Sequence, residues 1–319
     1  MFTRRTVLSI TFGTMVAVVL DQRAHAREDG KKIRIAFANF SDEAVFGAVV
    51  LKGIKDAAKA HDNLELTYYD NRQDAAKSIE NARTIVATRP DFVVWFCSIP
   101  DVNVTVGRLF KEASLSVITV QVPMPGVPFF AVDNALSGHE SAKALTAEAR
   151  KRWPGVTPEI LMINWPEMGP MFVERGNSAK ESLKGGFPNA NITEFSAIGD
   201  PNRARQQAAD FLTRNPNNKI LMWVFSDAYG VSALAAARNA GREDDVLVAT
   251  TGGDSSVFPE IRKARTAFVG SFSFFPELWG ADLLNAAIKG VNGEKLPARI
   301  SPTRQLFLSS ANIAQYYPQ

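Results

Sequence analysis

Cysteine and histidine are scarce in this chain of 319 residues. Cys97 is the single cysteine, so no disulfide can form within the chain, and the apolar stretch FVVWFC around it predicts a buried thiol rather than a reactive one. Of the three histidines, His25 lies in the first 26 residues, and only His61 and His139 remain beyond them. Too few histidines remain for a histidine-based metal site or proton relay, and we expect neither a metal nor a cofactor.

The chain also lacks a large excess of charge of either sign. Its formal net charge is +3, and the first 26 residues, with Arg4, Arg5, Arg23 and Asp21, carry +2 of it. The remaining chain, at +1, offers no strongly basic surface for nucleic acid or for an anionic membrane. It is long enough for two hydrophobic cores of ordinary domain size.

The first 26 residues have the pattern of an export signal. Arg4 and Arg5 precede an apolar run over residues 6–20 that is short for a membrane span, and Ala24-His25-Ala26 forms a small-x-small cleavage site. Residues 3–8, TRRTVL, resemble a twin-arginine signal and favour that route over general secretion. Because no stop-transfer pattern follows, an uncleaved anchor is disfavoured, and we predict a periplasmic protein cleaved after Ala26.

Beyond the signal, strand-like apolar runs alternate with longer helical patterns nearly to the C-terminus. Such alternation predicts a parallel α/β architecture. The expected strands are 33–40, 64–69, 92–97, 116–122, 129–133, 159–165, 192–197, 219–225, 246–251 and 267–273. Segments with apolar residues at helical spacing include 43–60, 74–88, 171–184, 203–214 and 276–289. Ten strands are too many for one simple lobe.

A hinge is expected near Asp133-Asn134, after the proline-rich turn VPMPGVP at 122–128, where one run of strand and helix units ends and another begins. Ligands of open parallel sheets bind beyond the carboxyl ends of the strands. The loops that should line a shared cleft begin at Asn39, Cys97, Gln121, Asn164 and Phe225.

Patterns for enzyme chemistry are weak. Gly252-Gly253 could suggest a phosphate loop, but the spacing fits neither the dinucleotide nor the P-loop fingerprint. A triad could be drawn from Ser98, His139 and Asp101, yet there is no GxSxG elbow and nothing specifies its geometry. A small exported hydrolase is therefore a poorly supported alternative, and we expect no enzyme activity.

Several segments, taken in order, carry a family resemblance. They are IRIAFANFSDEAVFGAVVLKGIKDAAKA, DNRQDAAKSIENARTIVATRPDFVVW, SVITVQ, AVDNALSG, VERGNSAKESL, WVFSDAYGVSALAAARNAG and TTGGDSSVFPEIRKAR. In order and spacing they resemble periplasmic solute-binding proteins of the ribose-binding type, which are related to the ligand domains of lactose-repressor-like regulators. The resemblance covers nearly all of the mature chain.

This resemblance implies a fold of two similar lobes, each a parallel β-sheet flanked by helices, joined by three chain crossings near Asp133, Phe274 and 303–307. The expected domains are an export signal at 1–26, a first lobe of 27–134 plus 275–303, and a second lobe of 135–274 plus 304–319. A cytoplasmic repressor is disfavoured because the export signal occupies the place of a DNA-binding helix-turn-helix.

The resemblance also implies a set of ligand-binding residues. Gln121 and Val122 stand where ribose binders have an Asp followed by an Arg, and Val173 replaces a second ligand-binding arginine, so the pocket should be more apolar than a ribose site. Arg175 matches a neighbouring arginine that we expect to be structural, and Trp165 and Met168 should lie near the cleft mouth. The predicted ligand-binding residues are Asn39, Phe46, Ser98, Gln121, Phe172, Ser226, Asp254 and Phe274.

Alternatives remain open for some of these residues. Phe46 could belong to the core face of its helix, since aromatics at helical spacing are often core. Asp254 could cap a helix rather than accept hydrogen bonds from ligand hydroxyls, and for Asp227 we prefer the helix cap. Gln121 ends a buried strand, where its amide needs partners that a ligand could supply.

The function expected from the resemblance is that of the substrate-binding component of an ABC importer, which binds a sugar or sugar-like molecule. Its partner would be a membrane permease, it would be a monomer, and it would bind no nucleic acid. The alternative within the same fold is a sensory protein that presents its ligand to a membrane receptor or sensor kinase.

Overall fold

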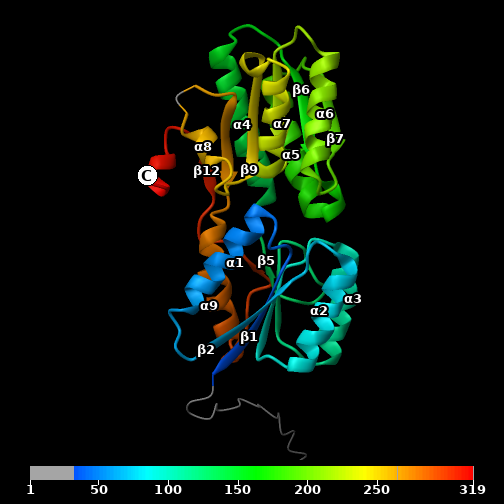
Figure 1. The fold of residues 1–319 in the computed structure, drawn as a ribbon, viewed down its shortest axis with the longest axis vertical. Helices are drawn as coiled ribbons and strands as arrows, with labels where there is room; N and C mark the ends of the chain where they lie inside the picture. The colour runs from blue at the N-terminus through cyan, green and yellow to red at the C-terminus, as the bar shows by residue number, and fades with distance from the viewer. Residues whose placement is uncertain (1–31, 264, 319) are drawn as a thin grey trace, which may run out of the picture. The chain divides into compact units, whose positions relative to one another are not determined.

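The computed structural model describes residues 32–263 and 265–318. The predicted twin-arginine signal and its cleavage site lie outside these residues. The described chain forms two six-stranded sheets with the orders β11-β5-β4-β3-β1-β2 and β12-β10-β9-β8-β6-β7. Helices accompany both sheets (Figure 1), so the predicted α/β fold of two similar lobes is confirmed.

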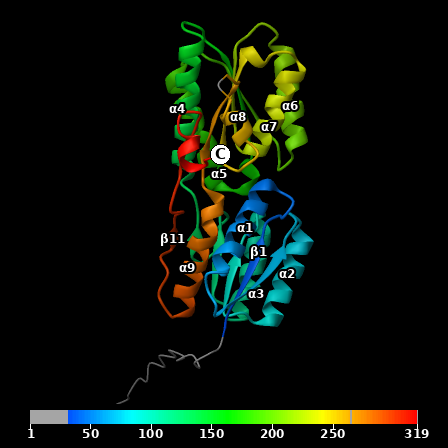
Figure 2. The same cartoon turned by 60° about the vertical axis from the view of Figure 1, so that its left-hand side comes forward.

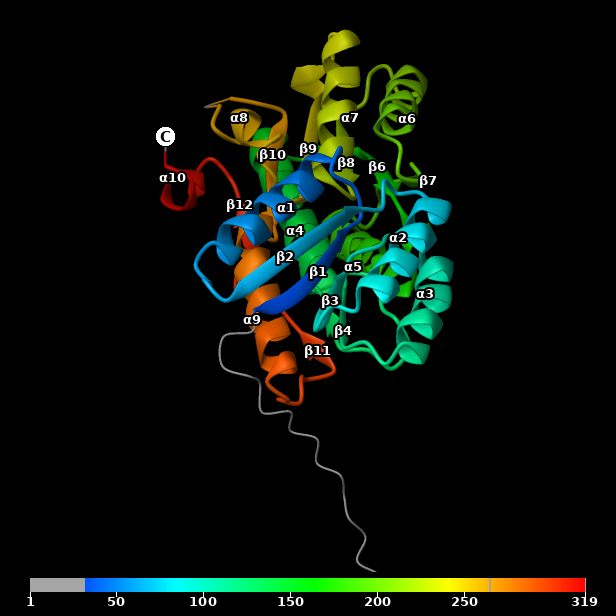
Figure 3. The same ribbon diagram turned by 60° about the horizontal axis from the view of Figure 1, so that its bottom comes forward.

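The first lobe contains a fully parallel sheet, whose central strands lie side by side in Figure 3. Its strands are β1 (Ile33–Asn39), β2 (Leu64–Asp70), β3 (Phe92–Trp95), β4 (Val117–Val120), β5 (Phe129–Phe130) and β11 (Arg299–Ile300). Its helices are α1 (Val45–Ala58), α2 (Ala75–Thr88), α3 (Pro100–Glu112) and α9 (Trp279–Val291), of which α1 packs on α9 and α2 on α3.

Strand β3 shows why this sheet is covered on both faces. Phe92 and Val94 belong to the hydrophobic cluster shared with α1 and α9, whereas Val93 and Trp95 belong to the one shared with α2 and α3. Because successive side chains point to opposite faces, a strand buried on both sides is apolar throughout. This explains the uninterrupted apolar runs of the sequence.

The second lobe has the same design, with β12 as its one antiparallel strand. Its strands are β6 (Glu159–Asn164), β7 (Ile192–Ser196), β8 (Ile220–Val224), β9 (Val246–Gly252), β10 (Phe268–Ser273) and β12 (Leu306–Leu308). Its helices are α4 (Asn134–Arg152), α5 (Pro170–Gly186), α6 (Pro201–Arg214), α7 (Asp227–Asn239), α8 (Phe258–Ile261) and α10 (Ile313–Tyr316). The main helix pairs are α4 with α5 and α6 with α7 (Figure 2).

The chain passes between the two sheets three times: between β5 and α4, between β10 and α9, and between β11 and β12. Asp133, Phe274 and Thr303, which the resemblance places near the crossings, all lie in these connections. At the first connection the Asp133 side chain accepts from the Leu136 N–H at 2.9 Å and caps α4, while its own N–H donates to Gln305 Oε1 at 2.9 Å.

Helices α3, α4 and α7 and the short strands β11 and β12 were not among the predicted segments. The buried face of α4 consists largely of small residues, including Ser137, Gly138, Ser141 and Ala142, so apolar periodicity does not reveal it. A Cβ on Gly138 would lie 2.1 Å from the Arg175 carbonyl oxygen, so this glycine allows α4 to approach α5 closely. In the part of the chain that the structure describes, no helix is long and apolar enough to cross a membrane.

Candidate ligand-binding site

A cavity of about 490 Å³ is bounded by loops at the carboxyl ends of strands from both sheets. Its volume lies within the range of roughly 300–1,000 Å³ that is usual for small-molecule sites. Trp165 and Met168, expected near the mouth, also line it. Seven of the eight predicted ligand-binding residues line it: Phe46, Ser98, Gln121, Phe172, Ser226, Asp254 and Phe274.

Asn39 is the predicted residue that does not line the cavity. It is fully buried, and its amide Nδ2 donates to the Ser41 carbonyl at 3.2 Å, to Asp42 Oδ1 at 2.7 Å and to the Gly47 carbonyl at 3.1 Å. These bonds hold the loop that leads from β1 into α1. Asn39 therefore shapes the loop that carries Phe46 and has no donor left for a ligand.

Aromatic rings from both lobes form much of the cavity wall. On the first lobe Phe40 lies 4.7 Å from Phe96, and the Trp279 ring lies 6.3 Å from Phe96, between ring centroids. On the second lobe the Phe225 ring lies 6.3 Å from Trp165 and 5.8 Å from Phe172. A ligand between these walls would contact flat apolar surfaces, which suits the C–H faces of sugars and other rings.

Phe46 combines both roles considered for it. It is the second residue of α1, is partly exposed and lines the cavity, yet it also packs against the core of the first lobe. Its ring meets Trp279 edge-on at 5.2 Å and Phe274 at 6.3 Å. The aromatic neighbours fix the orientation of the ring toward the cavity.

Gln121 has a buried amide with an unused donor. It follows β4, its backbone N–H donates to the Phe130 carbonyl at 2.8 Å, and its φ of 64° lies in the left-handed region that non-glycine residues seldom adopt. Its side-chain Nε2 is buried and has no hydrogen-bond partner among the described residues. A strained backbone and an unpaired amide at a cavity wall are together typical of a binding position.

Arg175 also lines the cavity, which its expected structural role did not predict. It is 3% exposed; Nε donates to Asn134 Oδ1 at 2.9 Å, and Nη1 donates to Thr251 Oγ1 at 2.9 Å and to the Phe225 carbonyl at 3.3 Å. Within 32–263 and 265–318, no residue accepts a hydrogen bond from Nη2. Nε and Nη1 thus have the expected structural role, because they bond protein acceptors. Nη2 keeps two N–H donors available beside the cavity.

Burial lowers the pKa of the Arg175 guanidinium to about 9, although the Asp227 carboxylate acts in the opposite direction. Rings of Phe225 and Phe274 lie 4.3 and 5.0 Å from the guanidinium carbon. The side chain is thus fixed by neutral acceptors and aromatic faces.

Asp227 does not have the capping role that we preferred for it. The N-cap of α7 is Ser226, and Asp227 is 1% exposed. Its Oδ1 accepts from Thr250 Oγ1 at 2.5 Å and Ser271 Oγ at 2.7 Å, and its Oδ2 accepts from the Asp254 N–H at 2.9 Å. The carboxylate therefore ties α7 to β9 and β10 and holds the Asp254 loop.

Asp227 should make stability depend on pH. Burial and the Asp254 carboxylate raise its pKa from 3.8 to about 7, so between these values the folded protein holds a proton that the unfolded chain has released. Proton binding by Asp227 therefore stabilises the folded protein fully below pH 4. The free energy of unfolding falls as the pH rises from 4 toward 7, by up to about 1.4 kcal/mol per pH unit. Urea unfolding of wild type and Asp227→Asn across this range should show wild type losing stability relative to the variant. Parallel curves would assign Asp227 an ordinary pKa.

The two carboxylate oxygens of Asp254 have different surroundings. Its Oδ1 accepts from the Ser256 N–H at 2.9 Å and from Ser256 Oγ at 2.5 Å, which forms a local turn rather than a helix cap. Among the described residues Oδ2 has no hydrogen-bond donor, and burial raises the pKa of the carboxyl group. One oxygen is therefore structural and the other is free for a ligand.

Ser98 and Ser226 occupy the middle of the two sheets, after β3 and β8. In the described chain neither hydroxyl has a side-chain hydrogen bond, although both residues line the cavity. His139 and Asp101 do not line it, so Ser98 is not brought together there with the other members of the triad that could be drawn from the sequence. Cys97 is buried as predicted, and burial raises the pKa of its thiol.

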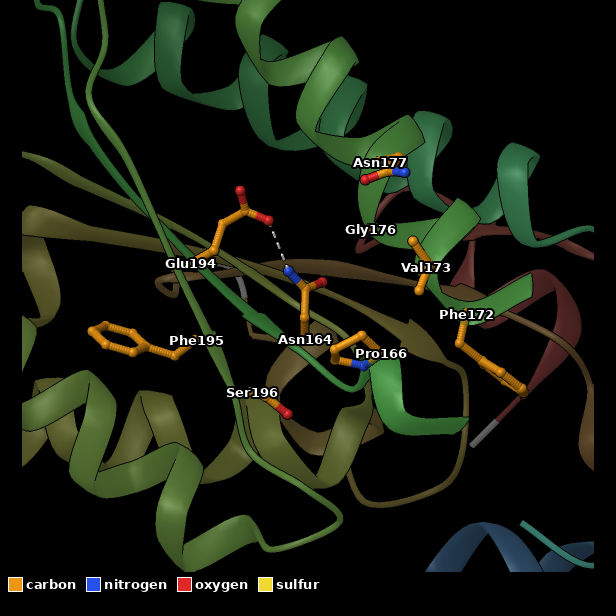
Figure 4. A pocket seen from close by; sticks show the side chains of 9 residues that line it. All are labelled: Asn164, Pro166, Phe172, Val173, Gly176, Asn177, Glu194, Phe195 and Ser196. Carbon is orange, nitrogen blue, oxygen red and sulfur yellow. Dashed lines mark hydrogen bonds between the residues drawn. The ribbon is translucent and has the colours of Figure 1, made fainter. Parts of the chain in front are cut away.

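A second hollow, of about 250 Å³, lies between α5 and the ends of β6 and β7 and shares Phe172 with the main cavity (Figure 4). Two of its polar residues bond each other, since Asn164 Nδ2 donates to Glu194 Oε2 at 3.3 Å and Glu194 also pairs with Lys180, and its walls come from the second lobe alone. Val173, which replaces an arginine of ribose binders, faces this hollow rather than the main cavity. The main cavity is therefore the better candidate.

Comparison with known families gives one match. The model described as a periplasmic binding protein domain matches residues 35–295. No curated protein matches the chain.

Solved structures with a similar fold are numerous. An ABC transporter solute-binding protein from Mycobacterium smegmatis with bound glycerol has a TM-score of 0.81 at 20% identity, over 90% of this chain and 98% of that one. One from Agrobacterium vitis with bound allitol has a TM-score of 0.79 at 17% identity, over 90% and 98%. One from Actinobacillus succinogenes 130z with bound D-allose has a TM-score of 0.78 at 18% identity, over 89% and 100%.

Proposed function

This chain belongs to the periplasmic binding protein domain family, and from that premise we propose that it is the substrate-binding component of an ABC importer that binds a sugar or sugar-like molecule between its lobes. The observation that carries the proposal is the cavity lined from both sheets, in which polar atoms remain unpaired beside aromatic walls. Its solved neighbours are solute-binding proteins with bound sugars and polyols, which supports a hydroxylated ligand.

Binding rather than catalysis is the proposed outcome. Contacts from two lobes to one ligand favour the closed arrangement, because a ligand shifts such an equilibrium by its differential affinity for the two states. A membrane permease would then recognise the closed, monomeric protein. We place the lobes at 27–134 plus 275–303 and 135–274 plus 304–319, so that the three crossings act as the hinge.

The proposed binding residues divide by chemistry. Gln121 and Arg175 donate, Asp254 accepts, and Ser98 and Ser226 can do either. The aromatic contacts come from Phe46, Phe172 and Phe274.

Closure can be measured by small-angle X-ray scattering of the mature chain with and without D-allose, allitol, myo-inositol or glycerol. A bound compound should reduce the radius of gyration. If a compound binds by calorimetry and leaves the scattering curve unchanged, the hinge mechanism is contradicted.

Phe46→Ala should weaken ligand binding by about 0.5–1.5 kcal/mol, because one stacking face of the cavity is removed while Trp279 and Phe274 remain. The measurement is calorimetric titration, with thermal unfolding of the unliganded variant as the control. A variant that melts far below wild type but binds normally would make Phe46 a core residue only.

We also propose export by the twin-arginine route. Replacing Arg4 and Arg5 together by lysine should trap the precursor inside the cell, because the paired arginines are read by a receptor as an address. Immunoblots of periplasmic fractions measure this. Equal periplasmic yield of the variant would exclude the twin-arginine route, and N-terminal sequencing of the wild-type product tests cleavage after Ala26.

A further inference from the structure

The order of the strands shows how far each cavity residue lies from the chain crossings. In both sheets the strands next to the chain crossings, β11 and β5 or β12 and β10, lie at one edge, and β2 or β7 lies at the other. Loops that follow the strands in turn therefore lie at increasing distances from the crossings. A residue that follows a strand can be placed along the cavity by the position of that strand.

Three of the unpaired polar groups of the cavity lie near the crossings, whereas the free hydroxyls of Ser98 and Ser226 follow the middle strands β3 and β8. Gln121 follows β4, and Asp254 follows β9, so each lies one strand from those at the crossing edge. Arg175 reaches the same end, because its guanidinium donates to Thr251 in β9 and to Asn134 at the first crossing. This polar end offers donors from Gln121 Nε2 and Arg175 Nη2 and an acceptor from Asp254 Oδ2.

The opposite end of the cavity is aromatic. Phe40 follows β1, and Trp165 and Met168 follow β6, each two strands beyond β4 or β9. The Trp165 ring packs on Gly199, where a Cβ would lie 2.8 Å from it, and its centroid is 6.2 Å from that of Tyr229. Arg72 and Gln73 at this end are exposed, and the buried surface is apolar apart from the Tyr229 hydroxyl, which has no hydrogen-bond partner among the described residues.

The two ends of the cavity lie two strands apart. Adjacent strands are separated by about 4.8 Å, so two strands correspond to about 10 Å. Ligand hydroxyl groups held against the aromatic end would lose their hydrogen bonds to water, and the Tyr229 hydroxyl is the one buried, unpaired polar partner there among the described residues. A free monosaccharide whose hydroxyl groups bind the polar end would therefore leave most of the aromatic surface without an apolar ring to match it.

We propose that the ligand joins a hydroxylated ring to a flat apolar ring, as nucleosides and aryl glycosides do. The hydroxylated ring binds Gln121, Arg175 and Asp254, and the flat ring lies between the walls of Phe40 and Trp165. This inference rests on the proposed function and specifies the ligand class of the same cavity.

Calorimetric titrations with matched pairs test the inference: D-ribose against adenosine, and D-glucose against phenyl β-D-glucopyranoside. In at least one pair the two-ring compound should bind roughly tenfold or more tightly than its parent sugar, because it adds an aromatic contact. The pair that responds distinguishes a nucleoside from a glycoside.

Two variants locate the effect within the cavity. Trp165→Ala should reduce the affinity for the two-ring compound roughly tenfold and reduce that for the parent sugar by clearly less, whereas Gln121→Leu should weaken both to a similar extent. Met168→Ala is the second variant at the aromatic end if Trp165→Ala fails to fold.

The outcomes separate the inference from the proposed function. Parent sugars or polyols that bind as tightly as their two-ring partners, or Trp165→Ala and Met168→Ala proteins that keep the preference for two rings, would overturn the inference and leave the proposed function standing. If no sugar, polyol, nucleoside or glycoside binds, both fail.

Discussion

Asp227→Ala is expected to destabilise the protein by roughly 3–5 kcal/mol in the absence of any ligand. The substitution removes the acceptor of three buried donors, the hydroxyls of Thr250 and Ser271 and the backbone N–H of Asp254. Each buried donor left without a partner costs about 1–3 kcal/mol, and breaking a buried hydrogen-bond network is among the largest single-site effects known. Urea unfolding of the mature protein at pH 6 measures the loss.

An exposed aspartate in the same lobe supplies the matched control. Asp210 on α6 is exposed and accepts one hydrogen bond from Gln206 Nε2 at 2.8 Å, so Asp210→Ala should change stability by no more than about 0.5 kcal/mol. If both alanine variants unfold at the urea concentration of wild type, Asp227 does not connect α7 with β9 and β10 in the way described.

Asp254→Ala is expected to reduce the ligand affinity of the protein tenfold to hundredfold, which corresponds to about 1–3 kcal/mol of binding free energy. Asp254 Oδ2 is free of protein donors at the polar end of the cavity, so ligand hydroxyls donating to it would be left buried and unpaired in the variant. Closure should weaken as well, because the ligand loses part of its preference for the closed state. Calorimetry gives the affinity, and scattering at a fixed ligand concentration gives the fraction of closed protein.

Two further variants separate the turn from the binding role of Asp254. Ser256→Ala removes the hydroxyl that bonds Oδ1 and leaves Oδ2 in place, so ligand affinity should stay near that of wild type. Asp254→Asn keeps an acceptor for the turn but loses the charge, and its affinity should fall between those of wild type and alanine. Equal losses in Ser256→Ala and Asp254→Ala would make the turn, rather than the carboxylate, the source of the effect.

The strands could be predicted from the sequence because strands buried on both faces are apolar throughout. β3, β4, β8 and β9 are buried along their whole length, and each lies within the predicted segment or exceeds it by one residue. Helix α4 could not be predicted in this way, since its buried face consists largely of serine, glycine and alanine, which give little apolar periodicity.

The site could be predicted only in part, because its chemistry depends on contacts between distant residues. Gln121 and Asp254 follow strands and could be expected at a cleft. Arg175 donates to Thr251, 76 positions away, and Ser271 donates to Asp227, 44 positions away. No local sequence pattern therefore reveals that Arg175 lines the cavity or that Asp227 is buried. Asn39 is the last residue of its strand and could be expected at the cleft in the same way, but hydrogen bonds to the following loop occupy its amide.

Thermal unfolding of the mature protein with sugars, polyols and the two-ring compounds tests the central claim most directly. A compound that binds the folded state stabilises it, by about 2.7 kcal/mol at one hundred times its dissociation constant. We expect at least one compound to raise the melting temperature of wild type, with a smaller rise at the same concentration in Asp254→Ala. A melting temperature that no compound changes, or a rise that is equal in both proteins, would contradict ligand binding in this cavity.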